Sequence, residues 1–214
     1  MHGAGPTGLL TALALADAGW EVQLRDPLPA RQLLERSRAY AFTHSSQRLL
    51  ERLELWAAAA PLMVPFRQLQ LCDLPLRRQV PFGLADLGRS RAGRPGAAVG
   101  WIALHQPLMA LLLERAAAHP AIALQLGLPA AQQEETDLLV AADGPHSPTR
   151  EAMGIGVWQL PYRQNCLTAQ VELRGSAPDE AWELFRPEGP FAVLPLGGPL
   201  SLIHISEPTR QAEI

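Results

Sequence analysis

The 214-residue sequence has no lysine, only two cysteines and no long apolar run. All 18 basic residues are arginine, a bias typical of GC-rich coding that says little about function. Cys72 and Cys166 stand far apart without CxxC spacing, which favours two reduced, packed thiols in a cytosolic protein over a redox or metal role. No apolar stretch approaches the roughly 20 residues of a membrane-spanning helix. The formal net charge of −3 argues against non-specific nucleic-acid binding, which needs a concentrated positive face.

Hydrophobic residues make up 48% of the chain, enough for the core of one large or two small domains. The apolar pattern predicts a helix over residues 7–18 and a strand over 21–25. A second helix, capped by Ser45 or Ser46, is expected to run to about Trp56. We expect its buried stripe to consist of Leu49, Leu50, Leu53 and Leu55.

The middle of the chain changes character twice. Residues 61–94 are rich in Pro, Gly and Arg among short strand-like pieces, which indicates an excursion out of the first domain. The pattern HQPLMALLLERAAAHP then predicts a helix from His105, and AIALQL (121–126) predicts a strand. DLLVAADG (137–144) is almost wholly apolar, as in a parallel strand covered on both faces. Ser147 is the predicted N-cap of a following helix with Pro148 at its first position.

The last third of the chain, with YRQNCLTAQVELRG and FAVLPLGG, is typical of antiparallel β-strands. The sequence therefore predicts an α/β fold in which a nucleotide-binding domain is interleaved with a β-rich domain. The expected boundaries are 1–60 and 99–157 for the nucleotide-binding domain, 61–98 and 158–199 for the β-rich domain, and 200–214 for a non-native tail.

The opening GAGPTG has the GxGxxG spacing of a dinucleotide-binding loop. The loop consists of Gly3, Ala4, Gly5, Pro6, Thr7 and Gly8. Gly3 permits a tight strand-to-helix turn, Gly5 lets a pyrophosphate approach the backbone, and Gly8 allows close helix packing. Asp26 ends the next predicted strand at about the spacing of an acid that binds a ribose diol. The alternatives are an incidental Gly-rich turn and a solvated carboxylate, and the combined spacing favours the dinucleotide.

A second motif distinguishes between FAD and NAD. DLLVAADGPHSPTREAMGI resembles the second fingerprint of the flavin-dependent aromatic hydroxylases, with Asp143 and Gly144 after a strand and Ser147 and Arg150 at set offsets. The resemblance implies that the Asp-Gly turn contacts the FAD ribose and lies near the path of the nicotinamide donor. In isolation the same residues fit an Asp-Gly turn with a capping Ser. In tandem with the glycine loop they favour FAD.

Other stretches extend the resemblance over roughly residues 3–199. SRAYAFTHSSQRLLERLELW is similar to the family segment whose arginine reaches FAD, which implies that role for Arg38. HQPLMALLLERAA is similar to a helix whose first turn carries Arg or Gln toward the cofactor, which implies Gln106. YRQNCLTAQVE and ELFRPEGPFAVLPLGG resemble substrate-domain strands of the ubiquinone-biosynthesis hydroxylases.

The resemblance implies a Rossmann-like FAD-binding domain interleaved with a β-rich substrate domain. It also implies a monooxygenase that uses NADH or NADPH and O₂ to hydroxylate a small aromatic substrate, of the phenol or polyprenylphenol type. We expect a cytoplasmic protein, and a polyprenyl substrate would add peripheral membrane contact. The alternatives are a flavin-dependent reductase or dehydrogenase of the same fold and a non-catalytic remnant. The oligomeric state stays open.

No residue is assigned as a catalytic acid or base, and no metal is expected. His44, His105 and His146 fit loop or capping roles better than proton transfer. Tyr162 and Arg163 fit strand packing better than a substrate cavity.

We expect the chain to be incomplete at both ends. The family's third fingerprint, a Gly-Asp-containing flavin loop, is absent, and only Met1 and His2 precede the glycine loop, where an apolar strand is usual. A permitted back-translation of residues 200–214 reads as a transposase sequencing adapter, so this tail is expected to be foreign. A chain without its first strand is expected to be poorly soluble, to bind FAD weakly or not at all, and to be inactive.

Overall fold

The computed structural model describes residues 1–88, 97–128, 136–160, 164–175 and 177–208. The chain divides into two compact units, each built from separate segments. The first unit comprises Met1–Ser37, Leu50–Ala59 and Leu104–Trp158, and the second comprises Arg38–Leu49, Ala60–Ala103 and Gln159–Ile214.

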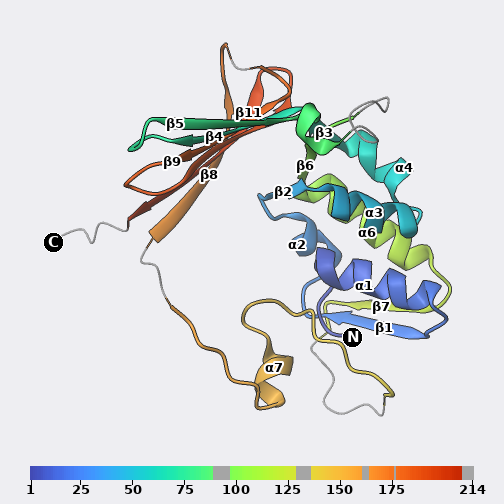
Figure 1. Ribbon diagram of the computed structural model, residues 1–214. Coiled ribbons are helices and arrows are strands. Elements are labelled where there is room, and N and C mark those ends of the chain that lie inside the picture. Colours follow the sequence, from blue (N-terminus) through green and yellow to red (C-terminus); the bar gives the residue numbers. More distant parts are fainter. Residues whose placement is uncertain (89–96, 129–135, 161–163, 176, 209–214) are drawn as a thin grey trace. The chain divides into compact units, whose positions relative to one another are not determined.

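The first unit contains helices and a small parallel sheet (Figure 1). Its elements are α1 (Pro6–Asp17), β1 (Val22–Asp26), α2 (Ala30–Leu34), α4 (Trp56–Ala59), α6 (His105–Ala118), β7 (Ile122–Leu126) and α7 (Pro148–Ala152). Helix α1 contacts both α6 and β1, and α6 contacts β7, so the two long helices pack together beside the strands. Leu9, Leu24, Met109 and Leu112 are fully buried in this packing. The predicted helices at residues 7–18 and from 105, and the strands at 21–25 and 121–126, are confirmed within one or two residues.

Strands β1 and β7 pair in parallel, in register from Val22 with Ile122 to Asp26 with Leu126. On the other edge of β1 lie the first residues of the chain. The amide of Arg25 donates to the carbonyl of Met1 over 3.0 Å, and the amide of Gly3 donates to the carbonyl of Arg25 over 2.7 Å. The stretch that leads into the glycine loop therefore runs parallel to β1, as a strand would.

The same stretch is bonded on its second side. The amide of His2 donates to the carbonyl of Val140 over 2.9 Å, and the amide of Ala142 donates to the carbonyl of His2 over 2.7 Å. These bonds make one isolated parallel bridge, between His2 and Ala141. The prediction of a buried strand over 137–144 is therefore wrong in extent, because a three-residue partner supports only one bridge. Leu138 and Leu139 are 47% and 40% exposed.

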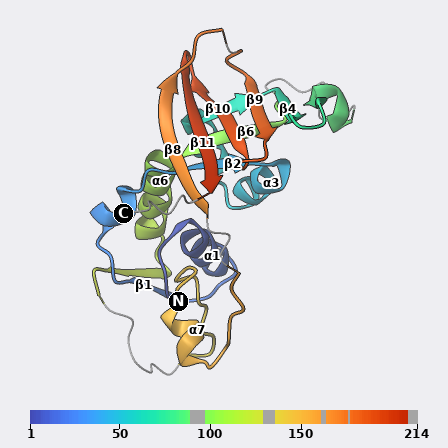
Figure 2. The same cartoon turned by 90° about the vertical axis from the view of Figure 1, so that its left-hand side faces the viewer.

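The second unit is mostly β-structure (Figure 2). Its elements are β2 (Ala39–Phe42), η1 (Ala60–Leu62), β3 (Met63–Phe66), β4 (Gln68–Asp73), β5 (Arg78–Gly83), η2 (Leu84–Leu87), β6 (Gly100–Leu104), β8 (Gln164–Glu172), β9 (Glu180–Phe185), β10 (Phe191–Gly197) and β11 (Leu200–Pro208). One sheet has six strands in the order β5-β4-β9-β10-β11-β8, with only β4 and β9 parallel among the pairs described, and the other has the order β2-β6-β3. Phe66, Ile102 and Ala181 form a buried cluster that joins the two sheets.

Three further expectations from the sequence can be compared with the observed helices and strands. Helix α3 (His44–Arg52) begins one residue before Ser45 and ends before Trp56, and Leu49 in it is 38% exposed, so its place in the buried stripe is wrong. Of the other stripe residues, Leu50 and Leu55 are buried. The predicted antiparallel strands near the C-terminus are confirmed as β8 and β10.

The observed division of the chain departs from the expected boundaries in several places, and residues 99–103, which include most of β6, lie in the second unit. Arg38–Leu49 belongs to the second unit, because β2 pairs into the three-stranded sheet. Residues 200–208 form β11, which is hydrogen-bonded to β10 and β8. The foreign origin of residues 200–214 stays a prediction.

Candidate cofactor site

The glycine loop lies between the Met1–Gly3 stretch and α1. Gly3 has a φ of +96°, which favours glycine, and a Cβ there would lie 2.2 Å from the carbonyl oxygen of Ala142. A Cβ on Gly8 would lie 1.8 Å from the carbonyl oxygen of Gly3. Nothing lies within 4 Å of a Cβ on Gly5, the N-cap of α1. Two glycines thus permit close packing inside the protein, whereas the third faces open space.

The N-terminus of α1 has no side-chain cap. Pro6 is its first residue, and Thr7 and Gly8 follow in the first turn. The first N–H groups of a helix have no partner within the helix, and they carry the positive end of its dipole. Such an end, next to an open Gly5, can accept an anionic group.

Asp26 holds the loop from the end of β1. The amide of Ala4 donates to its Oδ2 over 2.8 Å, and the amide of Leu28 donates to its Oδ1 over 2.8 Å. The carboxylate is 8% exposed. Asp26 is therefore not a solvated loop carboxylate, and its bond to Ala4 organises the glycine loop. Ribose binding by Asp26 stays a prediction.

The second motif lies directly against the glycine loop, since Gly3 packs on the backbone of Ala142 and Asp143. Ser147 caps α7 as predicted, with its Oγ accepting the amide of Arg150 over 3.0 Å. Gly144 has a φ of +93°, which fits the predicted Asp-Gly turn. The structure thus brings together two sequence motifs that are about 140 residues apart in the chain.

Asp143 is poised as an ionised acceptor. The amide of Thr149 donates to its Oδ2 over 3.0 Å. Burial alone would raise the pKa of Asp143, but polar contacts with Ser147 and Thr149 outweigh burial and lower the pKa. Its other oxygen, Oδ1, is buried and accepts no well-aligned hydrogen bond from the described residues, and the buried Nε of Arg150 donates none to them. Unsatisfied buried polar atoms are rare, and such an atom is commonly explained by a bound water or ion or by a functional role.

Sequence reasoning missed one contact of this site. Nδ1 of His2 lies 2.8 Å from Oγ1 of Thr149, which ties the stretch before the glycine loop to α7. Thr149 is 7% exposed. No sequence signal pointed to this pair, because it depends on the register of Met1–Gly3 beside residues 140–142.

The remaining predicted site residues lie elsewhere. Gln106 is exposed in the first turn of α6, and Arg38 is exposed just before β2 in the second unit. Tyr162 and Arg163 lie outside the described residues. The structure therefore gathers the glycine loop, Asp26, Asp143 and Gly144, and the roles of Arg38 and Gln106 stay predictions.

Two histidines have structural partners. Nε2 of His105 lies 2.7 Å from the carbonyl oxygen of Leu33, and His105 is 2% exposed. Nε2 of His44 lies 3.0 Å from the carbonyl oxygen of Ala98. Both contacts agree with the expectation that these side chains hold loops and helix ends.

Two absences concern the described part of the chain. Within it, no three His, Cys, Asp or Glu side chains gather as ligands for a metal ion. Among its helices, none has both the length and the apolar character to cross a membrane.

Comparisons with known proteins define the class to which this fold belongs. No family model matches the chain. The structure matches that of Klebsiella pneumoniae HpxO complexed with FAD and uric acid, with a TM-score of 0.77 and 19% identity, over 99% of this chain and 57% of that one. The fold is therefore one that solved flavin-dependent monooxygenases such as PieE share.

In sequence the chain is similar to ubiquinone hydroxylases. It is 32% identical to the ubiquinone hydroxylase UbiL of Rhodospirillum rubrum, over 92% of this chain and 48% of that protein. It is 27% identical to the 3-demethoxyubiquinol 3-hydroxylase of Escherichia coli, over 97% of this chain and 57% of that protein. The chain spans about half the length of the curated relatives it matches.

Proposed function

We propose that the chain is part of an FAD-dependent monooxygenase that hydroxylates an aromatic ring in ubiquinone biosynthesis. The observation that carries the proposal is the packing of the glycine loop against Asp143, because it brings together the two motifs that the sequence predicts to bind a dinucleotide. The relatives support the reaction, since both proteins named above are hydroxylases of ubiquinone or its precursors. NADH or NADPH would supply the electrons and O₂ the oxygen atom.

The residues present fit the adenosine diphosphate half of FAD. The uncapped N-terminus of α1 and the open Gly5 would hold the pyrophosphate by N–H donors and the helix dipole. Asp26 has both oxygens engaged by the backbone, and each oxygen keeps a lone pair for a ribose hydroxyl. Oδ1 of Asp143 would accept a further hydroxyl of the cofactor, which would satisfy this buried atom.

The roles of FAD and of the protein residues follow from the chemistry of the cofactor. When bound, FAD supplies the redox chemistry of oxygen activation. The protein residues would hold the dinucleotide, keep Asp143 ionised as an acceptor and fix the loop through Asp26. The substrate would be a phenol or polyprenylphenol, and a polyprenyl tail would bring the protein to the membrane surface.

Nucleotide binding tests the first half of the proposal. Titration of ¹⁵N-labelled protein with FAD and with ADP is expected to shift the amides of residues 3–8 and 143–150. We expect weak binding, with a dissociation constant near or above about 1 mM for ADP, which corresponds to about −4 kcal/mol. The control is FMN, which lacks the adenosine half. Equal shifts with FMN, or no shifts with any of the three, would contradict the assignment of the loop.

Ring hydroxylation tests the second half. A chimera in which residues 3–199 replace the matching part of the E. coli relative is expected to consume O₂ and NAD(P)H and to form hydroxylated product. Retained FAD, seen by its absorbance, would show that the chimera has folded. NAD(P)H oxidation without hydroxylation at any phenol would favour a reductase or dehydrogenase. A folded chimera with FAD but neither reaction would favour a non-catalytic remnant.

A further inference from the structure

The hairpin of β4 and β5 forms a corner of the six-stranded sheet (Figure 1). Strand β5 is at the edge of the sheet, and a four-residue turn, 74–77, joins Asp73 of β4 to its register partner Arg78. In this turn Leu74 is 49% exposed and Leu76 is 63% exposed. The two leucines therefore place apolar surface at a convex corner of the second unit.

Hydrogen bonds fix the backbone of the turn. The amide of Leu76 donates to Oδ1 of Asp73 over 2.9 Å, and the amide of Arg77 donates to the carbonyl of Leu74 over 3.2 Å. The amide of Leu74 donates to the carbonyl of Phe185, at the end of the neighbouring strand β9, over 3.1 Å. Because the turn is already ordered, its leucines lose little further backbone freedom when they bind a partner.

The leucines are followed directly by positive charge. Arg77 and Arg78 are exposed, and neither forms an ion pair within the part of the chain that the structure describes. Residues 74–82, LPLRRQVPF, contain no Asp or Glu, and Val80 among them is 57% exposed. Asp73, at the end of β4, offsets one of the two charges. The hairpin thus combines exposed apolar side chains with a net positive charge.

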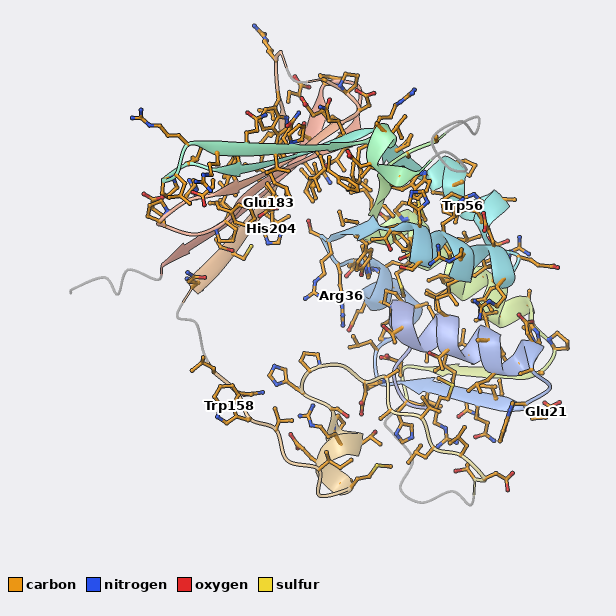
Figure 3. The ribbon with its side chains drawn as sticks, in the orientation of Figure 1. Glu21, Arg36, Trp56, Trp158, Glu183 and His204 are labelled. Carbon is orange, nitrogen blue, oxygen red and sulfur yellow. The ribbon has the colours of Figure 1, made fainter. Side chains whose placement is uncertain are left out.

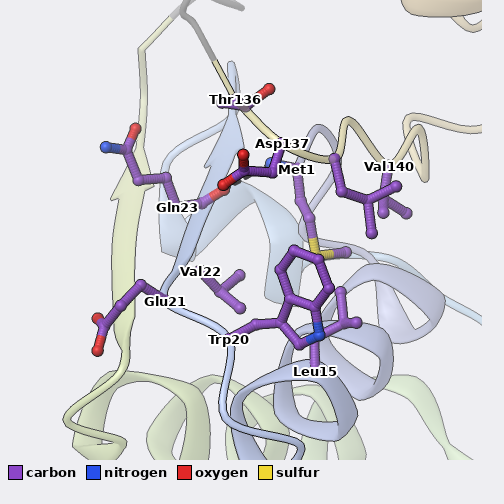
Figure 4. A pocket seen from close by; sticks show the side chains of 10 residues that line it. Met1, Leu15, Trp20, Glu21, Val22, Gln23, Thr136, Asp137 and Val140 are labelled. Atoms are coloured by element: carbon purple, nitrogen blue, oxygen red, sulfur yellow. Dashed lines mark hydrogen bonds between the residues drawn. The ribbon is translucent and has the colours of Figure 1, made fainter.

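An exposed apolar side chain elsewhere has a different setting. Trp20 is exposed and lines a pocket of about 220 Å³ in the first unit, with Leu15, Val22 and Val140 beside it (Figure 4). A hollow of this kind suits a small ligand, whereas the surface of a bilayer reaches side chains that protrude. The corner position therefore distinguishes the two leucines of the turn from Trp20.

We propose that residues 74–78 are a membrane-contacting tip for an anionic phospholipid bilayer. Leu74 and Leu76 enter the headgroup layer, where their apolar surface leaves water. Arg77 and Arg78 lie at the level of the phosphates, which arginine binds well and whose negative surface potential attracts it. This contact does not depend on the proposed function, in which the tail of the substrate brings the protein to the membrane.

The small size of the tip favours a bilayer over a protein partner. A stable protein interface involves about 20–30 residues on each side, far more than one turn supplies. Binding to a bilayer surface needs only a few apolar side chains together with attraction between basic residues and anionic lipid.

Flotation of the full chain with lipid vesicles tests the proposal. Vesicles of phosphatidylglycerol mixed with phosphatidylcholine are compared with vesicles of phosphatidylcholine alone, and neither contains a quinone. We expect the chain to float with the anionic vesicles and to be released in about 1 M salt, where the Debye length is about 3 Å. Flotation separates bound protein from aggregates, because aggregates sediment.

A pair of leucine substitutions tests the apolar part of the tip. Leu74→Ser combined with Leu76→Ser is expected to lower the partition onto anionic vesicles at least about tenfold. Leu62→Ser combined with Leu128→Ser is the matched control, because both of these leucines are exposed and neither stands next to an arginine. The control is expected to bind as the parent chain does.

A pair of arginine substitutions tests the charged part. Arg77→Gln combined with Arg78→Gln is expected to remove the preference for anionic over neutral vesicles. Arg48→Gln combined with Arg174→Gln removes two other exposed charges of the same unit and is expected to keep that preference.

A fluorescent label at the turn measures insertion without removing both leucines. Leu76→Cys in a Cys166→Ser background places the label there, because Cys72 is buried. An environment-sensitive dye on this thiol is expected to shift to the blue with anionic vesicles. The same dye at Leu62→Cys is expected to show no shift.

Each outcome supports or overturns the proposal. Weaker flotation of the tip variants alone, with a blue shift at Leu76→Cys, supports it. A parent chain that does not float, or an equal loss in the control pairs, would overturn it. A dimer that Leu74→Ser with Leu76→Ser converts to a monomer, in a chain that does not float, would assign the tip to a second copy instead. None of these results bears on FAD binding, because the vesicles carry no cofactor and the glycine loop lies in the other unit.

Discussion

The amide of Ala4 donates to Oδ2 of Asp26 over 2.8 Å, across 22 residues of sequence. The bond connects the end of β1 to the glycine loop, and the second oxygen of the same carboxylate accepts the amide of Leu28. One buried acid thus fixes the backbone on both sides of it. Asp26, which the sequence spacing predicts to bind a ribose, therefore has a structural role that does not need a ligand.

Replacement of Asp26 tests this role. Asp26→Ala leaves the amides of Ala4 and Leu28 without partners, and we expect a loss of about 1–3 kcal/mol in the free energy of unfolding. Asp26→Asn keeps one acceptor oxygen, so a smaller loss is expected. Urea denaturation of both variants measures the difference. If Asp26→Ala is as stable as the parent chain, the loop does not depend on this carboxylate.

The glycines of the loop offer a matched pair of substitutions. Gly8→Ala would place a Cβ 1.8 Å from the carbonyl oxygen of Gly3. Because this oxygen belongs to the backbone, the glycine loop itself would have to shift to relieve the clash. We expect it to destabilise the protein by several kcal/mol, in the range of the largest single-residue effects, about 4 kcal/mol. Gly5→Ala meets nothing within 4 Å and is expected to preserve stability while weakening nucleotide binding. Thermal unfolding and the ADP titration separate the two variants, and equal destabilisation by both would contradict this account.

Local signals predicted most of the elements in the first unit. The small-residue pattern after the glycine loop gave α1, and Ser147 followed by Pro148 gave the start of α7. These signals work because caps and apolar periodicity are properties of the residues themselves. The family resemblance implied that Asp143 contacts the cofactor, which stays a prediction, and in the structure Gly3 packs on the backbone of Asp143.

Features that depend on partners could not be predicted in the same way. Residues 137–144 have the composition of a buried strand, but a strand needs a neighbour along its length, and Met1–Gly3 supplies one for Ala141 alone. The contact between His2 and Thr149 has the same origin. Leu49 and Leu50 are neighbours in α3 and lie about 100° apart around the helix, and it is Leu50 that occupies the buried face.

The two cysteines are expected to differ in reactivity. Cys72 is 6% exposed, and burial, with a smaller effect of Glu180, raises the pKa of its thiol. Cys166 is exposed on β8, which corrects the expectation that both thiols are packed. Because the thiolate is the reactive form, an aromatic disulfide reagent should label the exposed Cys166 rapidly and the buried Cys72 only after unfolding. Cys166→Ser should remove the fast phase, and a fast phase that survives this change would contradict the assignment.

The burial of Glu183 leads us to predict that the stability of the protein depends on pH. It lies on β9 next to Ala192 of β10, with His204 on the following strand (Figure 3). Burial raises the pKa of its carboxyl, and the nearby His204 opposes this in part. The folded state therefore holds the proton more tightly than the unfolded chain, whose Glu pKa is about 4.3. Stability due to this group is full below that pH and is lost as the pH rises through the folded pKa.

Glu183→Gln should remove this loss. We expect the variant to be more stable than the parent chain at pH 8, and the difference to shrink toward zero near pH 4. Glu188→Gln is the matched control, because it removes the same charge at an exposed position. Urea denaturation of the three proteins at both pH values measures the effect. A gain for Glu183→Gln that is equal at pH 4 and pH 8, or equal to that of the control, would show that burial of the carboxylate is not its cause.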